Sequence, residues 1–160
     1  MTIVSNTGPL IALAKADQLS LLNSLYHNVL IPPCVHRELL AKTGTEADRL
    51  DLALSTFIRV AERPQVSPEV ELTTRMLDPG EREAIALAHN SSLPIIMDDR
   101  LGREAARRLG LTVTGTAGVV LQAKRENLIT SVRELLEQIR DRGYWLSDEL
   151  IEASAKLAGE

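Results

Sequence analysis

The feature of this sequence that most constrains its fold is a regular alternation of short apolar segments with longer amphipathic ones. The short segments are residues 2–5, 28–31, 57–60, 94–97 and 111–113. Their length and β-branched residues are typical of buried strands, whereas the stretches between them carry apolar residues at helical spacing. Successive strands separated by helices favour a parallel sheet covered on both faces. We therefore predict a three-layer α/β/α fold with a mostly parallel sheet of about five strands.

Capping and turn residues mark the expected helices. Thr7 can cap a helix that has Pro9 in its first turn, and Asp17 can cap the next one. Further helices are expected at 33–40, at 46–55, from Asp78, between Asp99 and Gly110, and from Thr116 to the end of the chain, with a loop over 63–68.

Length and composition limit the possible classes of protein. The 160 residues, 44% of them hydrophobic, suit one domain over 1–160, with a helical extension over 130–160, and exclude global disorder. The single cysteine excludes a disulfide or a zinc finger, and we expect a cytoplasmic protein with no membrane association. One Trp, two Tyr and one Phe, with a net charge of −4, argue against modules that stack successive bases on aromatic platforms.

Polar residues that follow the predicted strands are the candidates for a functional site, because open parallel sheets bind ligands at the carboxyl ends of their strands. Asn6 follows the first strand, Glu38 lies on the helix after the second, and Asp98 and Asp99 follow the fourth. Glu81 lies in the first turn of the helix before the fourth strand, on the same stripe as its inward-facing apolar residues.

Carboxylates that converge on one cleft repel each other unless a cation neutralises them. A Mg²⁺ or Mn²⁺ ion does so with one or two carboxylates and several waters, and it can activate water for attack on a phosphodiester. Taken singly, Glu81 near a helix N-terminus, Asp98 or Asp99 as a helix cap, and a solvated Glu38 have ordinary explanations. Taken together, they favour a metal cleft.

Several segments of the chain resemble the PIN-domain family, in particular a branch of nucleic-acid-binding proteins linked to toxin–antitoxin pairs. They are residues 4–15 (VSNTGPLIALAK), Ile31-Pro32 with Glu38, 80–88 (GEREAIALA), 97–103 (MDDRLGR), 110–116 (GLTVTGT) and 146–149 (LSDE).

The resemblance implies a metal-dependent endoribonuclease of PIN type that acts as the toxin of a toxin–antitoxin module. Glu38, Glu81, Asp98 and Asp99 would be catalytic and, with Asn6, would hold Mg²⁺ or Mn²⁺. Partners would be an RNA substrate, a small cognate antitoxin and a second copy in a homodimer. Asn6 stands where active PIN nucleases generally have an aspartate, so a weak or inactive nucleic-acid-binding module is the alternative.

Two further features of the sequence have more than one interpretation. Arg100, Arg103 and Arg107 share a helix face that could bind RNA phosphates, or they could form a solvated face paired with glutamate. We interpret Tyr144-Trp145 as docking the C-terminal helices onto the body of the protein or a second subunit, with base stacking as the alternative.

A phosphoacceptor receiver-like domain also collects acids at strand ends. It would need an acidic pair after the first strand and a lysine after the last. The sequence has Ser5-Asn6 and Thr114 there, so we reject this class.

Overall fold

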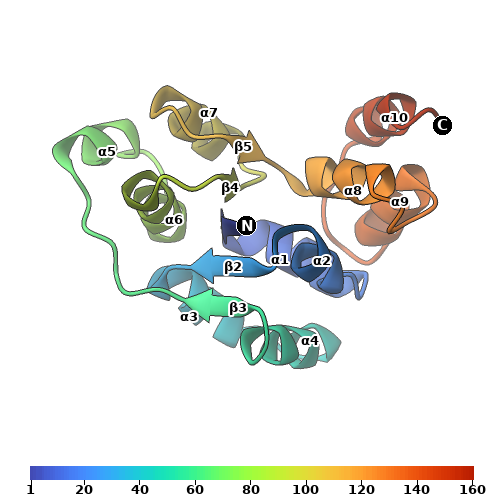
Figure 1. Cartoon of the computed structure of the whole chain (residues 1–160), viewed down its shortest axis with the longest axis horizontal. Helices are drawn as coiled ribbons and strands as arrows, with labels where there is room; N and C mark the ends of the chain where they lie inside the picture. Colours follow the sequence, from blue (N-terminus) through green and yellow to red (C-terminus); the bar gives the residue numbers. More distant parts are fainter.

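The computed structural model describes all residues, 1–160, and contains five strands and ten helices (Figure 1). The strands are β1 (Thr2–Ser5), β2 (Asn28–Ile31), β3 (Ile58–Val60), β4 (Ile95–Ile96) and β5 (Val113–Thr114). The helices are α1 (Thr7–Lys15), α2 (Ser20–Tyr26), α3 (Pro33–Leu40), α4 (Thr45–Leu54), α5 (Pro68–Thr73), α6 (Pro79–Ser91), α7 (Arg100–Arg108), α8 (Thr116–Arg125), α9 (Val132–Asp141) and α10 (Asp148–Leu157).

The five strands form one sheet in the order β3-β2-β1-β4-β5, and every neighbouring pair is parallel. The register aligns Ile3 with Val29 in β2 and Val4 with Ile95 in β4. The prediction of a mostly parallel, five-stranded α/β sheet is therefore confirmed.

The alternation of side chains along the strands produces the three layers. Ile3 and Ile96 belong to a buried cluster with α1, α2, α3, α4, α8, α9 and α10, whereas Val4 and Ile95 belong to a second cluster with α5, α6 and α7. Successive strand residues point to opposite faces of a sheet, so β1, β2 and β4 each supply side chains to both cores. Figure 1 shows α5, α6 and α7 on one side of the sheet and α1, α2, α8 and α9 on the other.

Some element boundaries differ from the prediction. The fifth strand is Val113–Thr114 instead of 111–113, because the N–H of Leu111 bonds to the carbonyl of Ala106 and still closes the end of α7. The short helix α5 begins at Pro68, the last residue of the predicted loop, and is not expected from the sequence; Ser67 caps it and Val70 anchors it in the core.

The expected caps of the first two helices were also wrong. Asn6, not Thr7, is the N-cap of α1, and α2 starts after Leu19, well past Asp17. None of the ten helices combines the length and the apolar character needed to cross a membrane.

Candidate active site

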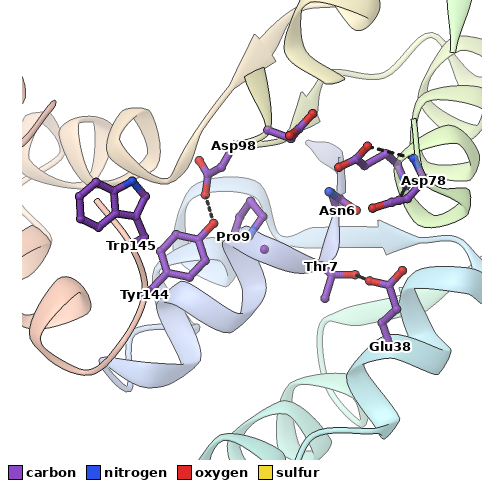
Figure 2. A pocket seen from close by; sticks show the side chains of 11 residues that line it. Asn6, Thr7, Pro9, Glu38, Asp78, Asp98, Tyr144 and Trp145 are labelled. Carbon is purple, nitrogen blue, oxygen red and sulfur yellow. Dashed lines mark hydrogen bonds between the residues drawn. The ribbon is translucent and has the colours of Figure 1, made fainter. Parts of the chain in front are cut away.

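The strand order places a crevice at the carboxyl ends of β1 and β4. From β1 the sheet continues to β2 and β3 on one side and to β4 and β5 on the other, so the connections diverge at this point, where open parallel sheets bind ligands. A cavity of about 470 Å³ opens there (Figure 2). Its lining residues are Asn6, Thr7, Gly8, Pro9, Glu38, Asp78, Glu81, Asp98, Asp99, Tyr144 and Trp145. We call this cavity the acidic pocket.

The acidic pocket therefore contains all five residues that the sequence singles out as metal ligands. Asn6 follows β1, and its backbone N–H donates a 3.0 Å bond to the carbonyl of Ile96, which continues the pairing of β1 with β4 beyond the strand. The residue is only 9% exposed, and its side chain makes no capping bond to α1. The amide is thus held at the floor of the pocket by the backbone.

Glu38 reaches the acidic pocket from α3. Its Oε2 accepts a hydrogen bond from the hydroxyl of Thr7, the first residue of α1, as Figure 2 shows. Gly80 in α6 makes room for this arrangement, because a Cβ there would overlap Oε1 of Glu38. The position of Glu38 thus depends on three helices that are distant in sequence.

Glu81 and Asp78 cap α6 reciprocally. The N–H of Glu81 donates to Oδ1 of Asp78 at 2.8 Å, and the N–H of Asp78 donates to Oε2 of Glu81 at 3.3 Å. Burial, followed by the negative charges of Asp78 and Asp99, raises the pKa of Glu81 to about 7. Burial is the largest contribution to the rise, and the two neighbouring carboxylates add to it.

Asp98 is held by three donors from two other segments. Its Oδ1 accepts from the N–H of Thr116 at 2.7 Å, and its Oδ2 accepts from the Thr116 hydroxyl at 2.6 Å and from the Tyr144 hydroxyl at 2.5 Å. Burial and the charge of Asp98 raise the pKa of Tyr144 far above its ordinary value, so the phenol stays protonated and donates. These bonds fix the carboxylate of Asp98 against α8 and the chain after α9.

Asp99 has a different local role from Asp98. Its Oδ2 accepts from the N–H of Gly102 at 2.7 Å, which makes Asp99 the N-cap of α7. The ordinary capping explanation therefore holds for Asp99 and for Glu81, although both also line the acidic pocket. Helix capping and a place in the pocket are compatible, because α6 and α7 both begin at its edge.

The donors in the acidic pocket suit a hard divalent cation. They are carboxylate and amide oxygens. The repulsion from Asp78 and Asp99, which adds to the effect of burial on the pKa of Glu81, is the kind that a cation relieves. No three acidic, histidine or cysteine side chains form a ready-made metal cluster. An ion held by one or two carboxylates and water, as is usual for Mg²⁺, needs no such cluster.

The three arginines predicted to bind phosphates do not present one common face. Arg103 turns inward, where its guanidinium donates to the carbonyl of Met97 at 2.8 Å and burial lowers its pKa. Arg100 is exposed and lies 3.4 Å from a carboxylate oxygen of Glu104, and Arg107 is exposed. Phosphate binding by Arg100 and Arg107 stays a prediction, whereas Arg103 supports the end of β4.

The structure adds residues to the site that sequence reasoning did not place there. Thr7, Asp78, Tyr144 and Thr116 bond to the acidic side chains. Asp78 had a local signal, because an aspartate three residues before a glutamate is a capping-box pattern. The bond between Tyr144 and Asp98 joins residues 46 positions apart, and no local pattern announces it.

We interpret Tyr144-Trp145 from the sequence as docking the C-terminal helices, but the structure places the two side chains in different environments. Tyr144 packs against the larger core cluster and bonds to Asp98. The Trp145 side chain is 81% exposed, so it does not dock the helices onto the body of the protein.

The all-parallel α/β sheet and the acids at its carboxyl edge agree with the nuclease-type fold of PIN domains. The chain belongs to the PIN-domain family, since the family model DUF3368, described as a PIN domain, matches residues 2–160.

Among solved structures, the chain is similar to a PilT N-terminus domain protein, SSO1118, from the hyperthermophilic archaeon Sulfolobus solfataricus P2. The two sequences are 18% identical, the match covers 92% of this chain and 100% of that one, and the TM-score is 0.48. No curated protein matches the sequence.

Proposed function

We propose that this PIN-domain protein is a divalent-metal-dependent endoribonuclease whose reaction centre is the acidic pocket. The observation that carries the proposal is that five residues from four separate segments of the fold line one cavity at the carboxyl edge of the sheet: Asn6, Glu38, Glu81, Asp98 and Asp99. A phosphodiester repels carboxylates, so a pocket with this lining suits phosphate chemistry only together with a cation.

Glu81 and Asp99 are the acids we expect to hold Mg²⁺ or Mn²⁺, with the amide oxygen of Asn6 as a neutral donor. The charge of Asp99 contributes to the raised pKa of Glu81, so the two carboxylates interact. When bound, the ion would supply a Lewis acid that offsets the charge developing on the phosphate.

The remaining acids act through their own contacts. Asp98 has three protein donors, so it keeps a fixed orientation beside the ion-binding residues. Glu38 is exposed and bonds only to Thr7, so its carboxylate is free to accept a proton from an attacking water.

The alternative is a PIN-fold module that binds nucleic acid without cutting it, and Asn6 favours this alternative. An amide supplies oxygen but no charge, so it binds Mg²⁺ more weakly than an aspartate would. The resemblance to toxin-like proteins adds finer proposals: a toxin role, a homodimer, and a small antitoxin whose Arg or Lys pairs with an acid of the pocket.

A cleavage assay on mixed RNA with Mg²⁺, Mn²⁺ or EDTA tests the activity. We expect cleavage with metal, none with EDTA, and loss of cleavage in Glu38→Gln. The matched control is Glu62→Gln, because Glu62 is exposed on a loop outside the pocket. RNA binding without cleavage under any of these conditions would select the binding module, and neither binding nor cleavage would refute both.

Co-expression with the small reading frame next to the gene, followed by pull-down with and without excess Mn²⁺, tests the antitoxin. We expect a complex that Mn²⁺ weakens. No complex, together with no growth defect when the protein is expressed alone, would refute the toxin role without affecting the nuclease proposal.

A further inference from the structure

The rim of the acidic pocket carries the only tryptophan of the chain. Trp145 lines the cavity together with Tyr144, and its side chain is 81% exposed. Figure 2 shows the indole on the side of Tyr144 and Asp98, away from Asp78 and Glu38. A large flat apolar ring thus lies at one end of a cavity that is otherwise lined mainly by polar and acidic residues.

The residues on either side of Trp145 hold it in this exposed position. Tyr144 is anchored through its hydroxyl to Asp98 and through its N–H to the carbonyl of Ile139, and Leu146 is only 4% exposed. Because both neighbours point into the protein, Trp145 must project outward from the segment between α9 and α10. Its exposure follows from the packing of the chain and is not the fraying of a loose loop.

The exposed residues next to Trp145 in the sequence are mostly polar or small. Arg142, Gly143, Asp148 and Glu149 are exposed around it in the sequence, and they are charged or small. A protein interface of standard size needs a contiguous patch of about 800 Å² on each partner, with an apolar centre. A single exposed indole among charged residues instead suits one flat ring, which stacking can bury on its own.

The charge of the acidic pocket gives a second reason to expect a contact with a base. A nucleic acid that crosses carboxylates gains little from its phosphates there, and Arg103 is engaged with Met97. Part of the affinity must therefore come from groups without charge. Stacking on an aromatic ring supplies such a contribution for any base whose face is free.

We propose that Trp145 stacks on one base of a single-stranded nucleic acid whose backbone crosses the acidic pocket. Tyr144 is then a positioning residue that fixes the indole relative to Asp98. The proposal rests on the proposed function and deepens it, because it selects unpaired strands over duplexes, whose bases are already stacked on each other. One indole can stack on one base, so the small number of other aromatic residues does not conflict with this proposal.

The single tryptophan makes the test direct, because all indole fluorescence comes from Trp145. We would titrate the Glu38→Gln variant, which we expect not to cleave, with a short oligoadenylate in Mg²⁺, and compare an abasic oligomer of the same length. We expect the oligoadenylate to quench the fluorescence and the abasic oligomer to leave it unchanged. In fluorescence anisotropy with a labelled oligoadenylate, Trp145→Ala should bind about 5- to 100-fold more weakly, and Trp145→Phe should retain most of the affinity.

The matched control is Leu52→Ala, which removes another exposed apolar side chain, on α4 and outside the acidic pocket, and should bind as the parent does. Binding of the oligomer without quenching, with Trp145→Ala unaffected, would overturn the stacking proposal and leave the nuclease proposal intact. Equal quenching by the abasic oligomer would also overturn it. So would a fluorescence change on protein dilution alone, because that change would mean that the indole contacts a second copy of the protein. No binding of any RNA, with or without Mn²⁺, would instead refute the proposed function itself.

Discussion

The hydroxyl of Tyr144 donates a 2.5 Å hydrogen bond to Oδ2 of Asp98, and this bond joins the segment between the last two helices to the carboxyl end of β4. The same carboxylate oxygen accepts from the hydroxyl of Thr116. Asp98, one of the acids of the acidic pocket, is thereby fixed by residues from the C-terminal third of the chain. The helices after β5 therefore shape the acidic pocket as well as covering the sheet.

Tyr144→Phe removes this bond and should destabilise the protein. A hydrogen bond to a charged group contributes about 1.5 to 3 kcal/mol, and Asp98 keeps its two bonds from Thr116, so we expect a loss near the lower value. Urea unfolding measures it. Tyr26→Phe is the control, because Tyr26 is partly buried but its hydroxyl has no hydrogen-bond partner, and it should change stability by less than about 0.5 kcal/mol. Equal effects of the two changes would contradict the prediction.

Gly80→Ala should impair cleavage without weakening the fold. A Cβ at Gly80 overlaps Oε1 of Glu38, whose carboxylate must then move away from Thr7. Glu38 is exposed and flexible, and alanine is a better helix former than glycine by about 1 kcal/mol, so stability should stay equal or rise.

A double-mutant comparison checks that Gly80→Ala acts through Glu38. Glu38→Asp shortens this side chain and withdraws its carboxylate from the position of the new Cβ. If Gly80→Ala acts through Glu38, it should lower the cleavage rate by a smaller factor in Glu38→Asp than in the parent. An equal factor in both backgrounds would show that Gly80 affects the pocket by another route.

Asn6→Asp should bind Mn²⁺ about tenfold more tightly, because a charged ligand replaces a neutral one in the same position. The new carboxylate adds to the repulsion among the pocket acids, although its place at the N-terminus of α1 offsets part of this cost. We therefore expect a lower melting temperature than the parent in EDTA and a larger rise on adding Mn²⁺. Unchanged or weaker binding by calorimetry would mean that Asn6 is not a ligand position.

Glu160 should make stability depend on pH in the acid range. Its carboxylate accepts hydrogen bonds from Lys124 and from the N–H groups of Val132 and Arg133 at the start of α9. The bond from Lys124 and these backbone bonds lower the pKa of Glu160 from 4.5 to about 2. The folded pKa lies below the unfolded one, so the stabilisation is complete above pH 4.5 and is lost as the pH falls toward 2.

Glu160→Gln measures that contribution. We expect a loss of about 1 kcal/mol in unfolding free energy at pH 7, comparable to a lost helix cap, and no difference from the parent near pH 2. Glu149→Gln is the control, because Glu149 is exposed and has no ion-pair or hydrogen-bond partner. A difference between Glu160→Gln and the parent that does not change with pH would contradict the ionic origin.

Much of the fold was predictable because its signals are local. The periods of apolar residues identified five strands in a parallel sheet, and the sheet then placed Asn6 and Asp98 at one edge. The helix after Pro68 was missed, because two nearby prolines resemble a loop when the burial of Val70 is not known.

The sequence by itself determined that Asn6, Asp98 and Asp99 share one edge of the sheet, since residues that directly follow parallel strands lie at the same edge. Only the tertiary structure decided how the acids are held: the hydroxyl of Thr7 bonds to Glu38, and the hydroxyl of Tyr144 bonds to Asp98. The tertiary structure also decided that Arg103 turns inward. The physical reason is the distance along the sequence between the residues that interact. Periodicity and capping depend on neighbours within a few residues, whereas the first two of these contacts join residues 31 and 46 positions apart, and the packing of whole helices alone brings them together.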